Sequence, residues 1–138
     1  MSLFSALSIS GSGMQTSQTW LNALSGNIAN QNDTVSTNQP VYQAQYVVAA
    51  PLAGGGPGGV GKGVGVAGVA LGPSTGQLVY DPSNPLANAQ GYVRQAKVNL
   101  GEQMVQLVMA QNGFQADASA FAQAHAAYQS ALNLASAA

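Results

Sequence analysis

The chain has 138 residues, of which 46% are hydrophobic, and it carries no cysteine and a formal net charge of −1. Its three basic residues form no patch that could neutralise phosphates, which argues against nucleic-acid binding. The absence of cysteine excludes both disulfide bonds and thiolate metal sites.

Charge is nearly absent from both ends of the chain. Residues 1–32 contain no charged side chain, and after Val98 only Glu102 and Asp117 are charged. Because the surface of a soluble monomer normally carries interspersed charges, we expect these ends to be covered. We find no secretory signal and no run of about 18 apolar residues, so the predicted cover is other protein chains rather than lipid.

Residues 3–30 are predicted to form the first helix. Apolar side chains recur there at alternating spacings of four and three residues, which keeps one stripe facing a partner helix. Gly11 and Gly13 interrupt the middle, and each costs about 1 kcal/mol relative to alanine, so we do not expect this helix to be stable alone. The stripe consists of Leu3, Leu7, Met14, Leu21, Leu24 and Ile28.

The middle of the chain is rich in glycine, proline and β-branched residues, which indicates strands and turns. We predict a small β-hairpin, too small to form a separate core, in which strand 64–71 returns through a turn at 72–76 into strand 77–80. The other predicted features are a strand at 41–48, a flexible loop at 54–59 and a dense turn cluster at 81–85.

Residues 98–136 are predicted to form a second helix, roughly 58 Å long at 1.5 Å per residue. Its flanks carry alanine and glutamine instead of charged pairs, which indicates close packing against several neighbours. The stripe consists of Leu100, Met104, Leu107, Phe114, Phe121, His125, Tyr128 and Leu132. The predicted fold is mainly α, with residues 1–32 and 98–138 forming a coiled-coil-like helical pair and residues 33–97 inserted between them.

Three motifs associated with catalysis are present only in part. Residues 56–62 match the start of a P-loop, but Gly63 stands where magnesium binding requires serine or threonine. Residues 72–76 match G-x-S-x-G, but a strand, not the required helix, is predicted to follow. The only histidine, His125, lies on the apolar stripe. We therefore predict no enzyme activity, no cofactor and no metal site.

Asn27 and Asn30 lie at the predicted end of the first helix. Asparagine commonly ends helices because it tolerates the left-handed conformation. Alternatively, the two amides fix the crossover out of the helix or bind a neighbouring subunit. The sequence leaves both interpretations open.

Two segments resemble the bacterial flagellar rod, hook and hook-associated proteins. The run Asn27-Ile28-Ala29-Asn30 resembles their N-terminal signature. Residues 78–93 resemble the segment that precedes the C-terminal helix in proximal rod subunits. The residues that carry this second match are Tyr80, Asp81, Pro82, Asn84, Pro85, Gly91 and Tyr92.

The resemblance implies a structural subunit of the periplasmic rod, exported by the flagellar type III apparatus without a cleaved signal peptide. Its terminal helices would form a torque-transmitting tube around the export channel. The implied partners are copies of itself, other proximal rod subunits, the rod–MS-ring junction protein and the distal rod protein, with no nucleic acid and no membrane insertion. We expect assembly to couple folding to binding. The alternative is a soluble coiled-coil adaptor that forms a discrete helical bundle.

Overall fold

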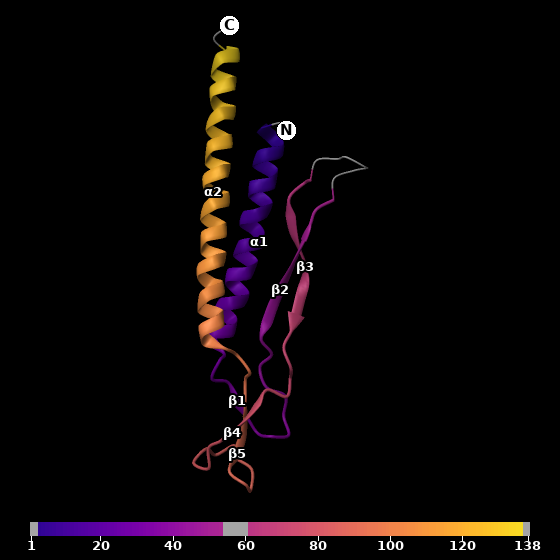
Figure 1. Ribbon diagram of the computed structural model, residues 1–138, viewed down its shortest axis with the longest axis vertical. Helices are drawn as coiled ribbons and strands as arrows, with labels where there is room; N and C mark the ends of the chain where they lie inside the picture. Colours follow the sequence, from indigo (N-terminus) through magenta and orange to yellow (C-terminus); the bar gives the residue numbers. More distant parts are fainter. Residues whose placement is uncertain (1–2, 54–60, 137–138) are drawn as a thin grey trace.

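The computed structural model describes residues 3–53 and 61–136, and it shows two long helices with a small β region between them in the sequence (Figure 1). Helix α1 spans Leu3–Ala29 and helix α2 spans Leu100–Ser136. The strands are β1 (Thr34–Val35), β2 (Gln45–Pro51), β3 (Val64–Leu71), β4 (Gln77–Tyr80) and β5 (Tyr92–Gln95). The prediction of two long helices with a β insertion is confirmed, with helix ends shifted by one or two residues.

The two helices lie side by side and run in opposite directions (Figure 1). The pairs that face one another along this seam are Phe4 and Tyr128, Gly13 and Asp117, Ser17 and Gly113, and Asn27 and Gln103. Helix α2 continues past Tyr128 to Ser136, beyond the first described turn of α1. The last turns of α2 therefore extend past its partner helix.

The face that α2 turns toward α1 follows a seven-residue repeat. One half of the repeat carries large side chains, namely Leu107, Phe114, Phe121 and Tyr128, which are half-buried or at the margin of exposure. The other half carries Gln103, Ala110, Asp117 and Ala124, which are buried or half-buried. Ala110 and Ala124 in this second half are small, which leaves room for the two helix backbones to approach one another there.

A two-stranded hairpin, β2 with β3, lies along the other side of α1 (Figure 1). The backbone N–H of Val64 donates a hydrogen bond to Ser12 Oγ at 3.1 Å, which fixes the start of β3 against the helix. Gly63 precedes it with φ +112°, and a Cβ there would collide with the Ser12 side chain. Helix α1 is therefore enclosed between α2 and the hairpin.

The predicted pairing of strand 64–71 with strand 77–80 is wrong. A turn does form at 72–76, where Gly76 N–H donates to the Pro73 carbonyl at 3.2 Å. This turn connects strands β3 and β4, which belong to two different sheets. Gly76 has φ +55° and lies directly against the Gln95 backbone, so the following strand aligns with β5. Strand β5 also pairs with β1, and β3 pairs with β2.

Two other expectations for the middle region differ from the structure or fall outside it. The strand expected at 41–48 begins only at Gln45. Before it, Val41 N–H donates to the Ser74 carbonyl at 3.1 Å and the Ala44 carbonyl accepts from Gly72 N–H at 2.8 Å, while both side chains are buried in the core. The flexible loop expected at 54–59 lies outside the described residues.

The core is small and lies where the helix pair meets the β region. Its buried apolar side chains are Ala23, Leu24, Val41, Ala44, Val93, Ala96 and Ala110. Most of the large apolar residues are exposed instead. Among the described helices, none combines the length and the apolar character needed to cross a membrane.

Candidate functional site

Asn27, in the last turn of α1, joins three parts of the molecule. Its side chain is completely buried. The Nδ2 group donates to the Gln45 carbonyl at 2.9 Å and to Gln103 Oε1 at 2.8 Å. Oδ1 accepts from Gln45 N–H at 2.7 Å and from the Tyr42 hydroxyl at 3.0 Å. These four bonds use the full capacity of the amide and connect α1 to α2 and to β2.

This geometry decides between the two interpretations left open for Asn27. No non-glycine residue in the described part of the chain has a positive φ, so Asn27 does not end the helix by adopting the left-handed conformation. Its amide fixes the crossover instead. Burial raises the pKa of the Tyr42 phenol, so the hydroxyl remains a donor at neutral pH. Asn30, in contrast, is exposed, and its amide donates to the Gly26 carbonyl at 2.8 Å.

The second predicted motif forms the loop between β4 and β5. The carboxylate of Asp81 accepts from the Ser83 hydroxyl at 2.8 Å and from the Asn84 amide at 3.2 Å. These bonds favour the charged form and hold the pKa of Asp81 below its usual value. The Asn84 side chain accepts in turn from Leu86 N–H at 3.0 Å, so the turn is held by its own side chains.

Gly91 closes the same loop. Its φ is +80°, and a Cβ at this position would lie 2.8 Å from Tyr80 Cε2 and 3.1 Å from Pro82 Cβ. The Tyr80 and Tyr92 rings meet edge to face, with 5.2 Å between their centroids. Both rings remain exposed, so the loop presents aromatic surface at the end of the molecule farthest from the C-terminus (Figure 1).

The outer face of α2 is apolar. Four large side chains within two turns of this face are between 54% and 62% exposed, namely Met104, Val105, Val108 and Met109. Only two charged residues, Glu102 and Asp117, lie on the whole helix. The apolar spacing predicted Met104 as part of a stripe, whereas the other three fall outside a single seven-residue repeat and were not predicted.

The residues predicted to form the helix interface differ in how far they are buried. Leu24 is buried, and Leu7, Met14, Leu21, Ile28, Leu107, Phe114 and Tyr128 are half-buried. Leu3, Leu100, Met104, Phe121, His125 and Leu132 are exposed in the single chain. His125 stacks on Phe121 with 6.4 Å between ring centroids, and its Nε2 lies 3.0 Å from the Gln129 amide. Gln103 was not predicted either, because nothing local distinguishes it from the other glutamines of α2.

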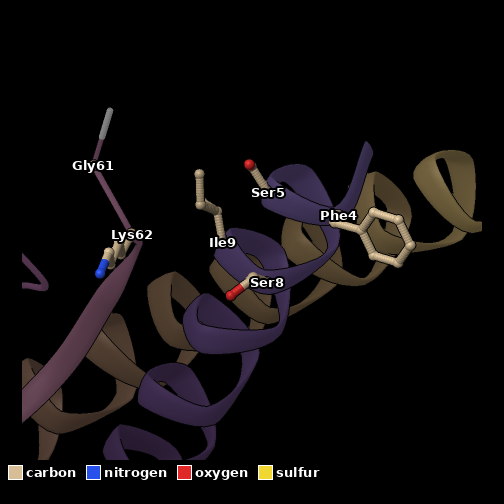
Figure 2. A pocket seen from close by; sticks show the side chains of 6 residues that line it. All are labelled: Phe4, Ser5, Ser8, Ile9, Gly61 and Lys62. Carbon is tan, nitrogen blue, oxygen red and sulfur yellow. The ribbon is translucent and has the colours of Figure 1, made fainter. Parts of the chain in front are cut away.

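A shallow cavity of about 380 Å³ lies between the start of α1 and the start of β3. Figure 2 shows Ile9 and Ser8 on the side toward Lys62, whereas Phe4 points away from it. The lining residues are Phe4, Ser5, Ser8, Ile9, Gly61 and Lys62. This set contains no histidine or carboxylate, and the described residues form no group of three or more metal-ligating side chains.

The partial P-loop and the G-x-S-x-G motif are not followed by the helix that each requires, in the described part of the chain. Lys62 is followed by strand β3, where a P-loop requires a helix. Residues 56–60 of that match lie outside the described residues. Gly76 leads into strand β4, where a nucleophile elbow also requires a helix.

Comparison with known proteins gives one consistent family. Residues 89–134 match the family model described as flagellar basal body rod FlgEFG protein C-terminal. The chain is 35% identical over 117 residues to the flagellar basal-body rod protein FlgC of Yersinia enterocolitica, and the match covers 85% of this chain and 86% of the relative. FlgC of Borreliella burgdorferi is 29% identical over 147 residues, covering 96% and 97% of the two chains. FlgC of Bacillus subtilis is 28% identical, covering 87% and 89%. These matches agree with the two antiparallel terminal helices and with both sequence signatures. The chain belongs to the family of flagellar basal-body rod proteins FlgC.

Proposed function

We propose that this chain is a structural, non-catalytic subunit of the flagellar basal-body rod that polymerises through the faces of its two helices. Family membership supports the rod, since the matched relatives are named as basal-body rod proteins. The proposed site is the periplasmic rod, reached through the flagellar type III apparatus. The proposed partners are copies of the chain, other proximal rod subunits, the rod–MS-ring junction protein and the distal rod protein.

The outer face of α2 is the observation that carries this proposal. Met104, Val105, Val108 and Met109 form a contiguous apolar surface that α1 does not cover. Exposed apolar patches of this kind mark sites of association, and the helix carries only two charged side chains to keep its surface solvated. We infer that neighbouring subunits cover it in the rod.

The two halves of the predicted stripes take different roles in this proposal. The half-buried members join α1 to α2 in a coiled-coil-like pair. The exposed members Leu3, Leu100, Met104, His125 and Leu132 pack against neighbouring subunits, and Phe121, at the margin of exposure on the inner face of α2, contributes to both contacts. Residues 1–32 and 98–138 then form an axial helical domain, and residues 33–97 form the region inserted between its helices. Rigid packing of many such helices would let the rod act as a drive shaft around the export channel.

Val108 offers a direct test, because glutamate has a higher helix propensity than valine and should not unfold the helix. Val108→Glu is expected to abolish rods and swimming when it replaces the normal gene, while the circular dichroism of the monomer stays unchanged. Val108→Leu keeps the face apolar and is the matched control, expected to retain both rods and swimming. Normal rods with Val108→Glu would show that this face is not an assembly contact.

Gene deletion tests the rod assignment itself. Basal bodies imaged from the deletion strain should contain rings without a rod, with swimming restored by the intact gene. Normal rods in that strain would contradict the rod assignment and favour the alternative, a discrete helical bundle. Such a bundle would sediment as a defined dimer or tetramer.

Folding is proposed to be completed on assembly. Helix α2 runs past α1 after Tyr128, and an unpaired helical segment of this length is marginal in water. Far-UV circular dichroism of the dilute monomer is therefore expected to show less helix than α1 and α2 contain together. Full helicity in the dilute monomer would contradict coupled folding and binding.

A further inference from the structure

The apolar repeat of the helix pair does not by itself fix how far along α1 the second helix sits. The large side chains on the inner face of α2 recur every seven residues, at Leu107, Phe114, Phe121 and Tyr128. A slip by one such repeat, roughly 10.5 Å along the helix axis, would present a similar surface to α1. Another feature has to select the observed register.

The chain segments that connect the helices to the sheet do not by themselves fix the axial position of α2 on α1. Strand β1 pairs with β5 over only two residue pairs, Thr34 with Gln95 and Val35 with Arg94. Residues 30–33 and 96–99 link this ladder to the two helices, and four extended residues reach at most about 13–14 Å. Fully extended, such links are longer than a slip of one repeat, and the slip would break the hydrogen bond that Ala96 N–H donates to the Asp33 carbonyl at 2.9 Å.

Polar and small residues in the seam distinguish the registers. Gln103 is 1% exposed, and its Oε1 accepts from the buried Asn27 amide at 2.8 Å. After a slip of seven residues Ala110 would face Asn27 and offer no acceptor, leaving a buried amide hydrogen without its partner. The same slip would move the Asp117 carboxyl from Gly13, where no Cβ occupies the space, onto Trp20.

We propose that the Asn27–Gln103 amide pair sets the axial register of α2 on α1. A buried amide pair in this seam leaves an unsatisfied amide in every other register, as a buried asparagine does in a coiled coil. The inference concerns the fold of the single chain, so it does not depend on what covers the outer face of α2.

Gln103→Met removes the acceptor on α2 while keeping the length of the side chain. It leaves the three bonds of Asn27 to Tyr42 and Gln45 in place. Gln106→Met is the matched control, one turn further on, because the Gln106 amide donates at the surface to Glu102 Oε1 at 3.0 Å.

Register is read from disulfide trapping, which the absence of natural cysteine makes unambiguous. A Cβ at Gly113 would lie 3.4 Å from Ser17 Oγ, so Ser17→Cys with Gly113→Cys reports the observed register. Ser17→Cys with Ala120→Cys reports a slip of seven residues. Under mild oxidation, Gln103→Met is expected to raise the ratio of slipped to native disulfide about tenfold, whereas Gln106→Met leaves it unchanged.

Relocating the amide gives a second test that does not depend on the stability of Gln103→Met. The variant Gln103→Met with Ala110→Gln places the acceptor one repeat further along α2. It is expected to form mainly the slipped disulfide. Exclusive formation of the native disulfide in both variants would overturn the proposal and assign the register to the pairing of β1 with β5.

Discussion

The contact between Gly13 and Asp117 predicts opposite effects for two chemically identical substitutions in α1. Both Gly11 and Gly13 lie inside the helix, where replacing glycine by alanine stabilises by about 1 kcal/mol. A Cβ at Gly11 meets nothing within 4 Å, whereas a Cβ at Gly13 would overlap the Asp117 carboxyl. Overpacking at such a contact costs about 1–3 kcal/mol where the neighbouring side chain is held in place, and Asp117 is half-buried against α1.

Gly11→Ala is therefore expected to raise the free energy of unfolding by about 1 kcal/mol. Gly13→Ala should lower it by about 1 kcal/mol, the difference between a mid-range overlap of about 2 kcal/mol and the gain in helix propensity. Combining Gly13→Ala with Asp117→Ala removes the overlap, and the double variant should exceed the parent protein in stability.

Urea denaturation followed by far-UV circular dichroism measures these differences, and a double-mutant cycle isolates the contact. The expected interaction energy between positions 13 and 117 is about 2 kcal/mol. Equal stabilisation by Gly11→Ala and Gly13→Ala would refute the reasoning, because it would mean that the Asp117 side chain moves aside without cost.

Two further predictions concern the loop between β4 and β5. Gly91→Ala is expected to destabilise the protein by at least about 1 kcal/mol, because a φ of +80° disfavours any side chain and a Cβ would crowd Tyr80 and Pro82. Thermal denaturation measures this, and an unchanged melting temperature would contradict it. The pKa of Asp81 is lower in the folded protein than its unfolded value of about 3.9. The hydrogen bonds of its carboxylate to Ser83 and Asn84 therefore contribute stability above the unfolded pKa, and this contribution is lost as the pH falls through the lower folded pKa. The Asn84 side-chain amide should then shift in NMR spectra below about pH 4, and Asp81→Asn should remove that pH dependence, whereas persistence of the shift in Asp81→Asn would assign it to another group.

The helices could be predicted because their signal is long and redundant. Many spaced apolar positions and the near absence of charge all indicate the same two segments. Which face of α2 turns inward is a harder question. Met104 and Gln103 are neighbours, and hydrophobicity alone favours Met104, yet Gln103 takes the buried position because Asn27 lies opposite it. That choice depends on a contact between residues far apart in the sequence.

The strand pairings were predictable only in part, for a similar reason. Residues 72–76 have the composition of a hairpin turn, and a turn does form there. Local composition does not reveal that Gly76 lies against the Gln95 backbone, which directs the next strand to β5. Of the two motif asparagines, the sequence identified both but gave no sign that Asn27 is buried and Asn30 exposed.

The unequal lengths of α1 and α2 give the subunit a built-in polarity. At one end the chain turns between helix and sheet, and at the other a single helix projects with Leu132 and Leu134 half or more exposed. Units with such dissimilar ends, joined head to tail, produce a structure whose two termini differ. Each end of such an assembly accepts the next unit in one orientation only.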